Sequence, residues 1–374
     1  MSGARLRVGV LGAGTVGSEV VRALLVRPDD LHASDGATLE LTAVAVRDPA
    51  RGVAAGVPAE LLSDAPAHLV ADEEIDVIVE LMGGDEPAHT LMAAALSMGK
   101  SVVTANKHVI AHHGPELETI ARRTGAALRF EAAVGGGIPV LGPLATDLAA
   151  NRVTRVRGIV NGTTNFILSA MTDEDDPVEF ADALAEAKRL GYAEADPSGD
   201  IEGHDAVNKL VILARLAFDR WLDPATIPTR PDGADGPAGP GITTVSLADE
   251  AHARAAGRII RLVATVAADP DGVLRAAVLP TALPLDSALG RTTGVRNRIE
   301  VDATPVGRVG FDGPGAGGPA TSSAVLGDLI AISRAAGSTW GPRREARAPS
   351  GDAVSRPETG LMTTASGIRY PIDD

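Results

Sequence analysis

The sequence is informative first through what it lacks. There is no cysteine among its 374 residues, which excludes disulfides, thiolate catalysis and cysteine-ligated zinc. Aromatic residues make up only 2% of the chain, and no apolar run approaches the roughly 18 residues of a membrane span. The N-terminus enters a strand pattern at once and leaves no room for a signal peptide, so we expect a cytoplasmic protein with no membrane partner.

Positive charge is also scarce. The formal net charge is −15, which argues against nucleic acid or an anionic membrane as the main partner. Nearly all basic residues are arginines, and only four are lysines. Because arginine stays protonated and lysine can pass a proton, each lysine is a candidate for chemistry.

The first part of the chain alternates between apolar strand patterns and helical patterns. The length suggests two or three domains. Predicted strands cover 6–11, 39–46, 75–83, 101–107 and 127–134. Predicted helices follow the turn at 12–17 and cover 87–99 and 115–125. This alternation predicts an α/β fold with a Rossmann-type doubly wound sheet.

The character of the sequence changes after residue 151. A strand that runs into a polar turn and a helix is expected over 152–168. Further helices are expected over 176–191, 204–218, 251–267 and 321–335, and strands over 273–279, 297–302 and 306–311. The Pro/Gly-rich segment 228–241 is expected to be a flexible loop. This mixture predicts a second, α+β domain.

The predicted domain limits follow from these patterns. Residues 1–140, with a returning helix at 318–335, are expected to form the dinucleotide-binding domain. Residues 141–317 are expected to form the catalytic and dimerisation domain. The tail 337–374 has little periodicity and receives no predicted structure.

A glycine-rich turn follows the first strand. Gly12, Gly14 and Gly17 form G-x-G-x-x-G between a predicted strand and a predicted helix. The first glycine permits the turn, the second lets the backbone approach a pyrophosphate, and the third packs helix against strand. A pyrophosphate would then lie on the helix N-terminus, beside Thr15 and Val16, where free N–H groups favour anions. The alternative is a plain strand-to-helix turn in a chain with 42 glycines.

The end of the second strand bears on the choice of cofactor. An acidic residue there would bind the ribose 2′-hydroxyl and select NAD. This strand instead ends in Arg47, with Asp48 behind it. Because arginine can pair with a 2′-phosphate, we expect NADP to be accepted and preferred, with NAD as the alternative.

Two lysines stand out by position. Lys107 is predicted to end a strand at the carboxyl edge of the sheet, where α/β sheets bind ligands. Lys209 follows Asp205 by one helical turn, after the acid-rich segment GYAEADPSGDIEGHD (191–205). Its spacing fits an ordinary surface ion pair and equally a proton donor tuned by nearby carboxylates.

Several stretches, taken in order, carry a resemblance to a known family. They are GAGTVG (12–17), VELMGG (79–84), TANK (104–107), EAAVGGGIP (131–139), NGTTNFIL (161–168), GYAEADPSGDIEGHDAVNK (191–209) and GPGAGG (313–318). From residue 6 to about 335 the chain resembles homoserine dehydrogenase. The long acidic segment together with NGTTNFIL is the most specific part of this resemblance.

The resemblance implies a reaction and roles for its residues. The reaction is the reversible reduction of L-aspartate 4-semialdehyde to L-homoserine by a nicotinamide cofactor, on the route to threonine, methionine and isoleucine. The implied roles are Lys209 as general acid, Lys107 beside nicotinamide and substrate, Asp200 assisting proton transfer, Glu194 and Asp205 binding substrate, and Thr104, Gly191 and Gly317 approaching the cofactor. A homodimer formed through the sheet of the second domain is also implied.

The segment EAAVGGGIP carries a possible metal site. In the family that the chain resembles, the equivalent segment holds a sodium ion, and the matching ligands here are the Glu131 carboxylate and the carbonyls of Val134, Gly136 and Ile138. Oxygen ligands suit a hard cation of this kind. The alternative is a plain turn that leaves the sheet. We expect the ion, in a structural role.

Some features have simpler interpretations. The Asn and Thr residues of NGTTNFIL can serve as helix caps. His112 and His113 are adjacent, and adjacent helix residues do not face each other, so we expect surface residues and not ligands. The roughly 40 residues after 335 are too few for the ACT domain of many bacterial relatives, so we expect no threonine feedback through such a domain.

Two rival functions remain at this point. One is another two-domain Rossmann oxidoreductase that acts on an amino acid or a sugar. The other is a dinucleotide-binding regulatory protein without turnover. The combination of Glu194, Asp205 and Lys209 speaks against both rivals.

Overall fold

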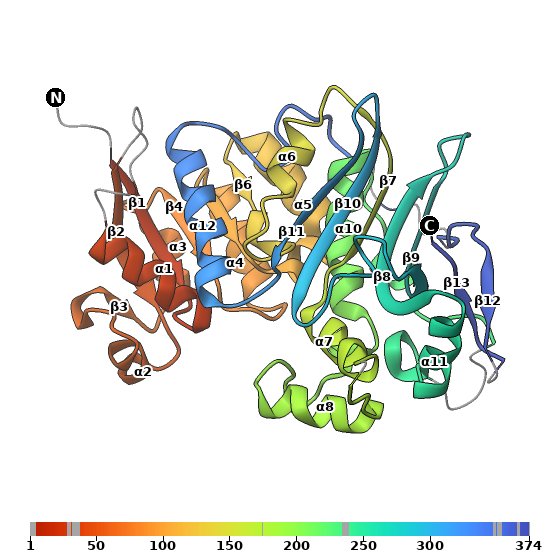
Figure 1. Cartoon of the computed structure of the whole chain (residues 1–374). Coiled ribbons are helices and arrows are strands. Elements are labelled where there is room, and N and C mark those ends of the chain that lie inside the picture. The colour runs from red at the N-terminus through yellow and green to blue at the C-terminus, as the bar shows by residue number, and fades with distance from the viewer. Residues whose placement is uncertain are drawn as a thin grey trace. The chain divides into compact units, whose positions relative to one another are not determined.

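The computed structural model describes residues 5–27, 31, 38–173, 175–233, 239–346, 349, 354–364 and 367–373. The chain forms two compact units, which are interleaved along the sequence (Figure 1). Unit 1 comprises Met1–Ala149 and Ala316–Ala348, and unit 2 comprises Ala150–Gly315 and Pro349–Asp374. The tail therefore contributes to both units.

Unit 1 is built on a six-stranded parallel sheet with the order β3-β2-β1-β4-β5-β6. Its strands are β1 (Arg5–Leu11), β2 (Thr38–Ala45), β3 (Leu62–Ser63), β4 (Val77–Glu80), β5 (Ser101–Thr104) and β6 (Leu128–Arg129). The strand order reverses next to β1, which confirms the predicted doubly wound sheet.

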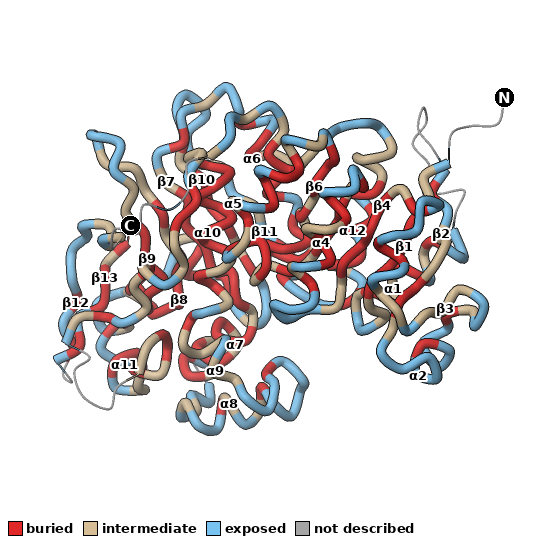
Figure 2. Tube along the Cα trace, turned by 180° about the vertical axis from the view of Figure 1, so that it is seen from behind, coloured by how far each residue is buried: buried red, intermediate tan, exposed pale blue. Residues whose placement is uncertain are grey.

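Helices supply the remaining layers of unit 1. They are α1 (Thr15–Val26), α2 (Pro49–Ala54), α3 (Pro66–Ala71), α4 (Ala88–Ser97), α5 (Lys107–Thr124), α6 (Leu141–Ala145) and α12 (Gly318–Ser333). Helices α1 and α12 contact each other and share one buried apolar core with the central strands (Figure 2). Val8, Val79, Val325 and Leu329 belong to this core and are fully buried. Helix α12, which comes late in the sequence, thus completes the core of the N-terminal sheet.

Unit 2 is built on a five-stranded antiparallel sheet with the order β11-β10-β7-β8-β9. Its strands are β7 (Arg152–Ile159), β8 (Arg258–Ala268), β9 (Leu274–Pro284), β10 (Arg296–Thr304) and β11 (Gly307–Pro314). Its helices are α7 (Gly162–Met171), α8 (Phe180–Arg189), α9 (Ser198–Ile201), α10 (His204–Phe218) and α11 (Leu247–Ala255). Helix α10 begins and ends where the sequence predicts.

Two predicted elements were wrong in part. The helix expected over 251–267 ends at Ala255, and residues 258–268 form strand β8, which pairs with β9 along its full length. Gly257, with φ +72°, takes the left-handed conformation that stops α11. The strand expected over 127–134 ends at Arg129 and is followed by a short 3₁₀ helix at Glu131–Ala133.

Lys107 also differs from its predicted place. Strand β5 ends at Thr104, and Lys107 is the first residue of helix α5. The side chain of Asn106 caps this helix by accepting a hydrogen bond from the amide of Val109 at 3.2 Å. Lys107 thus follows the carboxyl end of β5, at a helix N-terminus and not at a strand end.

The C-terminal segment belongs to unit 2 and carries a small antiparallel pair, β12 (Leu361–Thr363) and β13 (Arg369–Pro371). Tyr370 is fully buried and donates a hydrogen bond to the Thr244 carbonyl at 3.2 Å. The Asp373 carboxylate lies 2.5 Å from the buried Arg157 guanidinium. These contacts fix a segment for which periodicity predicted no structure. Within the predicted loop 228–241, residues 234–238 lie outside the described residues.

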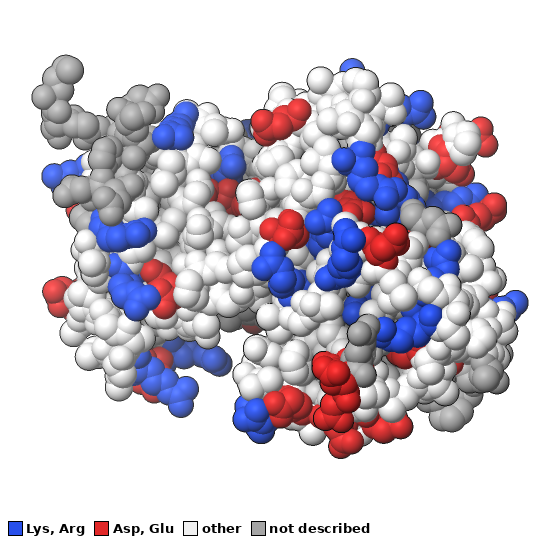
Figure 3. Space-filling model, viewed as in Figure 1, with Lys and Arg blue, Asp and Glu red and all other residues white. Residues whose placement is uncertain are grey.

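Charges of both signs mix on the face of unit 2 formed by β10 and β11 (Figure 3). Arg296 pairs with Asp312 at 2.7 Å, and Arg308 pairs with Asp302 at 2.7 Å. Arginines on this face therefore have acidic partners at close range. Among the described residues, no helix combines the length and apolar character that crossing a membrane requires.

Candidate active site

The glycine turn between β1 and α1 has the geometry that phosphate binding needs. Gly12 has φ +99°, and a Cβ there would lie 2.8 Å from the Leu81 carbonyl oxygen. A Cβ on Gly17 would lie 2.0 Å from the Gly12 carbonyl oxygen, so helix and turn touch backbone to backbone. A Cβ on Gly14 would meet nothing within 4 Å, which leaves open space above the second glycine. The first and third positions thus require glycine for packing, and the second leaves the helix N-terminus accessible.

The first backbone amides of helix α1 have no capping side chain within the described part of the chain. The N-cap of this helix is Gly14, and no acidic residue occurs in its first turn. Thr15 and Val16 therefore offer amide groups to an anion, as a dinucleotide pyrophosphate requires. Gly317, the N-cap of α12, lies close by, because a Cβ on the next residue, Gly318, would stand 2.8 Å from the Thr15 carbonyl oxygen.

A pocket in unit 1 opens in front of this turn. Its wall includes Gly12 and Gly14, the end of β2 at Arg47, the start of α2 at Arg51, and the loop that follows β4 at 83–87. Because it lies at the carboxyl ends of parallel strands where the strand order reverses, its position is that of nucleotide sites in doubly wound sheets. The residues present fit a dinucleotide.

Asp48, after the end of β2, caps a helix, whereas Arg47 and Arg51 line the pocket. Asp48 is the N-cap of α2, and its Oδ1 accepts hydrogen bonds from the amides of Ala50 and Arg51 at 3.0 and 3.4 Å. Its other oxygen lies 3.5 Å from the Arg51 guanidinium. Arg47 and Arg51 are exposed and line the pocket. Asp48 is thus occupied by hydrogen bonds to the first turn of α2, and the guanidinium groups of Arg47 and Arg51 line the pocket.

A buried carboxylate organises the opposite side of this pocket. Glu80, which is fully buried, accepts hydrogen bonds from the Met82 amide at 2.8 Å and from the Thr104 hydroxyl at 2.7 Å. Burial raises the pKa of Glu80. The Thr104 hydroxyl in turn accepts a bond from the Asn106 amide at 2.9 Å. This chain of bonds ties the end of β4 to the end of β5 and so positions Lys107 at the start of α5.

The Lys209 side chain is the centre of the candidate residues in unit 2. It lies on α10, is only 8% exposed, and its Nζ donates to the Val160 carbonyl at 2.6 Å and to Asp205 Oδ2 at 2.7 Å. An ammonium group has three donors, and these two contacts use two of them. The side chain is held in one direction, and the contacts within the described part of the chain leave one N–H group for a ligand.

Asn161 joins this lysine pair to the acidic segment. Its Nδ2 donates to Asp200 Oδ1 at 2.7 Å and to Asp205 Oδ2 at 2.8 Å, while its Oδ1 caps α7. Burial raises the pKa of Asp200; the Asn161 hydrogen bond opposes this shift, and the charge of Asp205 adds to it. Asp200, Asp205 and Lys209 thus form one bonded group, as their spacing along the acidic segment allowed but did not require.

Two other predicted residues lie outside this bonded group. Glu194 and Gly191 are both exposed, and Gly191 has φ +77°. Within the described part of the chain, the hydrogen bonds that connect Lys209, Asp205, Asn161 and Asp200 do not include Glu194. Glu194 therefore presents its carboxylate to solvent.

The predicted sodium ligands form a buried turn in unit 1. Gly135 and Gly136 have φ +73° and +56°, and Val134, Gly136 and Ile138 are all buried. No backbone amide of the described residues donates to the carbonyls of these three. Carbonyl groups in this state suit a hard cation.

The Glu131 carboxylate adjoins this turn. It accepts bonds from the amides of Val140 and Leu141, each at 2.8 Å, and of Gly142 at 2.7 Å. These bonds use three of about four lone-pair positions and leave one for a cation. Burial, followed by the charge of Asp328, raises the pKa of Glu131, so a cation would relieve an unfavourable negative site. The residues present fit an oxygen-coordinated ion.

Sequence reasoning missed three residues of these sites. Arg51 was not predicted because it lies beyond the strand end, in the first turn of α2. Asn161 was interpreted as a helix cap, which it is, but its amide nitrogen also bonds two acids. Glu80, an acid in an apolar strand, was a visible anomaly because buried carboxylates need partners.

Known proteins resemble this chain over most of its length. Residues 12–131 match the family model described as the NAD binding domain of homoserine dehydrogenase, and residues 139–330 match the model described as homoserine dehydrogenase. The homoserine dehydrogenase of Corynebacterium glutamicum is 44% identical over 336 residues, which cover 89% of this chain and 73% of that protein. That of Mycobacterium tuberculosis (strain H37Rv) is 46% identical over 332 residues, covering 87% and 72%.

Solved structures agree. A homoserine dehydrogenase from Thiobacillus denitrificans aligns with a TM-score of 0.85 at 35% identity and covers 93% of this chain and 81% of its own. A hyperthermophilic archaeal homoserine dehydrogenase in complex with NADPH aligns with a TM-score of 0.71 at 28% identity, covering 87% and 97%.

Proposed function

Because the chain belongs to the homoserine dehydrogenase family, we propose that it interconverts L-aspartate 4-semialdehyde and L-homoserine in the biosynthesis of threonine, methionine and isoleucine. It is an oxidoreductase that acts on a CH–OH group with a nicotinamide dinucleotide. The bound nicotinamide supplies the hydride that reaches the aldehyde carbon. The residues of the chain must hold the substrate and deliver the proton.

The constrained position of Lys209 carries this proposal. As hydride arrives, negative charge develops on the aldehyde oxygen, and a fixed ammonium group stabilises charge that appears only then. Lys209 donates its proton to this oxygen, and the Val160 carbonyl and the Asp205 carboxylate hold it in place. Asp200, connected to Asp205 through Asn161, assists the return of a proton to the lysine. In the reverse direction the same groups accept the proton of homoserine.

The other candidate residues bind the two ligands. Asp205 and the exposed Glu194 receive the α-ammonium group of the substrate, since carboxylates pair with such cations. Lys107 acts beside the nicotinamide. Arg47 and Arg51 favour NADP over NAD, because their guanidinium groups line the pocket while Asp48 is engaged as a helix cap. Glu131 and the turn that follows it hold a structural sodium ion.

Assembly and location complete the proposal. The chain forms a homodimer through the five-stranded sheet of unit 2, in keeping with its resemblance to the family, and acts in the cytoplasm. Light scattering after gel filtration measures the first of these, with a mass near twice the 38.1 kDa of one chain as the expected result.

One assay tests the activity and the role of the lysine together. NADP-linked oxidation of L-homoserine is followed at 340 nm for the wild type, Lys209→Ala and the control Arg189→Ala. Removing a general acid lowers kcat by roughly 10²- to 10⁴-fold. Arg189, exposed on α8 and paired with Glu186, should tolerate the same truncation with little loss. Absence of homoserine oxidation in the wild type would overturn the activity, and full activity of Lys209→Ala would overturn only the role of the lysine.

A further inference from the structure

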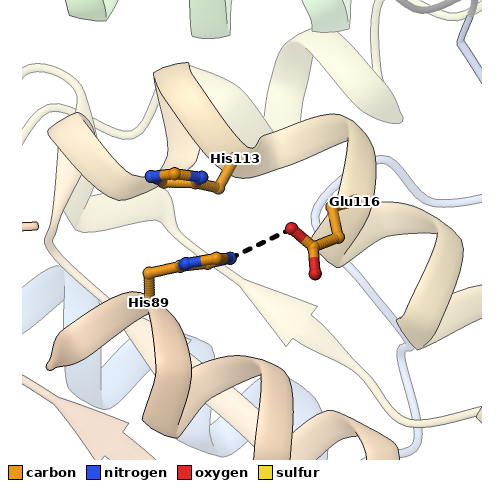
Figure 4. A group of neighbouring side chains, drawn as sticks. All are labelled: His89, His113 and Glu116. Carbon is orange, nitrogen blue, oxygen red and sulfur yellow. Dashed lines mark hydrogen bonds and ion pairs between the residues drawn. The ribbon is translucent and has the colours of Figure 1, made fainter. Parts of the chain in front are cut away.

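Two helices of unit 1 bring together three side chains that the dehydrogenase reaction does not use. His89 lies at the start of α4, and His113 and Glu116 lie one turn apart on α5 (Figure 4). One ligand atom of each lies within 4.8 Å of those of the other two. His89 Nε2 is 3.1 Å from Glu116 Oε2, and the two imidazole rings stack with their centroids 3.8 Å apart.

Each imidazole in this group already has a carboxylate on its far nitrogen. His89 Nδ1 lies 3.2 Å from Glu86 Oε1, and His113 Nε2 lies 2.8 Å from Asp85 Oδ1. Metal-binding histidines usually have this arrangement, because the outer carboxylate fixes the tautomer and raises the basicity of the inner nitrogen. It leaves Nε2 of His89 and Nδ1 of His113 as the atoms available for an ion.

We propose that His89, His113 and Glu116 form a binding site for a divalent transition-metal ion of the Zn²⁺ class. Two imidazoles and one carboxylate are ligands that zinc accepts, and a water molecule completes a tetrahedral set. Hard ions such as Mg²⁺ prefer oxygen ligands and would bind weakly here. The separation between His89 Nε2 and Glu116 Oε2 already matches that of two ligands on one zinc ion, about 3.3 Å for bonds of about 2.0 Å.

The second imidazole must move for the site to close. The ring planes are 13° from parallel, so their in-plane lone pairs do not converge in this structure. Tilting the ring of His113 directs its inner nitrogen toward the same point. This side chain is 28% exposed and has room at the surface for the change. Binding of the ion therefore exchanges a stacked pair of rings for a coordinated pair.

The outer carboxylates connect this site to the nucleotide pocket. Glu86 lines that pocket, and Asp85 and Glu86 follow Gly83 and Gly84 in the same loop. Asn106, the N-cap of α5, also donates a hydrogen bond from its Nδ2 to the Gly84 carbonyl at 2.8 Å. An ion that fixes His89 and His113 therefore also fixes this loop through Glu86 and Asp85. We expect bound Zn²⁺ to change the affinity for the cofactor.

Direct metal titration tests the site. The full-length protein, with any affinity tag removed, is stripped with a chelator, dialysed and titrated with Zn²⁺ by calorimetry. We expect one ion per chain, and visible absorption of Co²⁺ in its place should show a low-symmetry four-coordinate ion. The absence of cysteine simplifies this measurement, because no thiolate competes.

The variants separate the site from the fold. His113→Ala and Glu116→Gln should each weaken Zn²⁺ binding by about tenfold or more, since even the loss of an outer partner costs about 10- to 100-fold. Glu116 is 56% exposed, so its replacement leaves the fold intact. His252→Ala, an exposed histidine on α11, is the control and should bind as the wild type does. No stoichiometric binding by the wild type, or unchanged binding by both site variants, would overturn the proposal.

Discussion

Lys209 donates to Asp205 across one turn of α10, with 2.7 Å between Nζ and Oδ2 and both side chains almost entirely out of contact with solvent. A pair at this spacing on an exposed helix face contributes only about 0.2–0.5 kcal/mol. Here the same oxygen also accepts a bond from Asn161, so the charge is distributed over a bonded group. The lysine is therefore fixed in position as a surface lysine would not be.

The charge of Asp205 should matter chiefly for binding homoserine. Asp205→Asn keeps an oxygen for Lys209 but loses the negative charge that faces the substrate ammonium group. Because hydrogen bonds between charged groups contribute about 1.5–3 kcal/mol, we expect the KM for homoserine to rise about 10- to 100-fold. Steady-state kinetics at saturating NADP measures this. Asp182→Asn, on the exposed side of α8, is the control, and an unchanged KM in Asp205→Asn would contradict the assignment.

Asp200 should set the acid limb of the pH profile. Burial raises its pKa, so it accepts a proton at a higher pH than an ordinary aspartate does. We expect kcat to fall as pH decreases through this raised value, and Asp200→Asn to be slow at every pH with no acid limb from this group.

The same shift makes a prediction about stability. Because the folded-state pKa is raised, the folded state favours the protonated form of Asp200. Its stabilising contribution is present below the ordinary pKa and disappears as pH rises through the raised value. The neutral Asp200→Asn variant should therefore melt higher than the wild type at neutral pH, although it is less active. Calorimetric melting across this range tests the sign, and a lower melting temperature at neutral pH would refute it.

The two arginines at the pocket should control the preference for NADP. Arg47→Ala and Arg51→Ala each remove a guanidinium group that can pair with the 2′-phosphate. We expect each to raise the KM for NADP by about tenfold or more and to leave the KM for NAD nearly unchanged. Arg5→Ala removes an exposed arginine paired with Glu40 and serves as the control. Equal effects on both cofactors would argue against contact with the 2′-phosphate.

Sodium should stabilise unit 1 through the turn after Glu131. Thermal unfolding in sodium chloride, compared with choline chloride at the same ionic strength, should show a higher melting temperature by about 2–4 °C for each 1 kcal/mol of ion binding. Glu131→Gln should abolish this difference. The test is the difference in melting temperature between the two salts for each protein, and not the melting temperature of the variant itself. The variant also disturbs the three hydrogen bonds from backbone amides to this carboxylate, which lowers its stability in both salts.

Asp373 should stabilise unit 2 from the end of the chain. Its carboxylate pairs with Arg157, whose side chain is 2% exposed, and Glu300 pairs with the same arginine at 3.1 Å. Because Glu300 still neutralises the arginine, Asp373→Ala should cost about 1–3 kcal/mol, less than the 3–5 kcal/mol, roughly, for an isolated buried pair. The matched Asp312→Ala, in an exposed pair with Arg296, should cost under about 1 kcal/mol. Urea unfolding of both variants checks the difference.

The sequence predicted the parts of the fold in which local pattern and tertiary contact agree. The turn from Gly12 to Gly17 is specified by backbone contacts that only glycine permits, so its motif is readable. Strand β8 was mistaken for a helix because its residues are buried on both faces and show no alternation. Gly257 before it, and the β-branched residues within it, were signals for a strand.

The candidate sites, like the fold, could be predicted from the sequence only where local spacing determines the contact. The positions of Asp205 and Lys209 follow from helical spacing, whereas the bonds of Asn161 to Asp200 and Asp205 depend on how β7, α9 and α10 meet in space. The sequence offered no reason to assign a role to His113, because its neighbour His112 does not face it on the helix. Its partner His89 comes from a different helix, and only the packing of α4 against α5 brings them together.

The order of the segments along the chain has a consequence for synthesis on the ribosome. The parallel sheet is complete at residue 129, but α12 (Gly318–Ser333), which supplies Val325 and Leu329 to its core, is translated only after the strands of the second sheet. At typical elongation rates of about 5–20 residues per second, the apolar surface that α12 covers stays open for on the order of ten seconds or more. Unit 2 likewise waits for its last strands. A nascent chain of this protein thus gives chaperones a long interval in which to bind, because each unit is built from two separate segments of the chain.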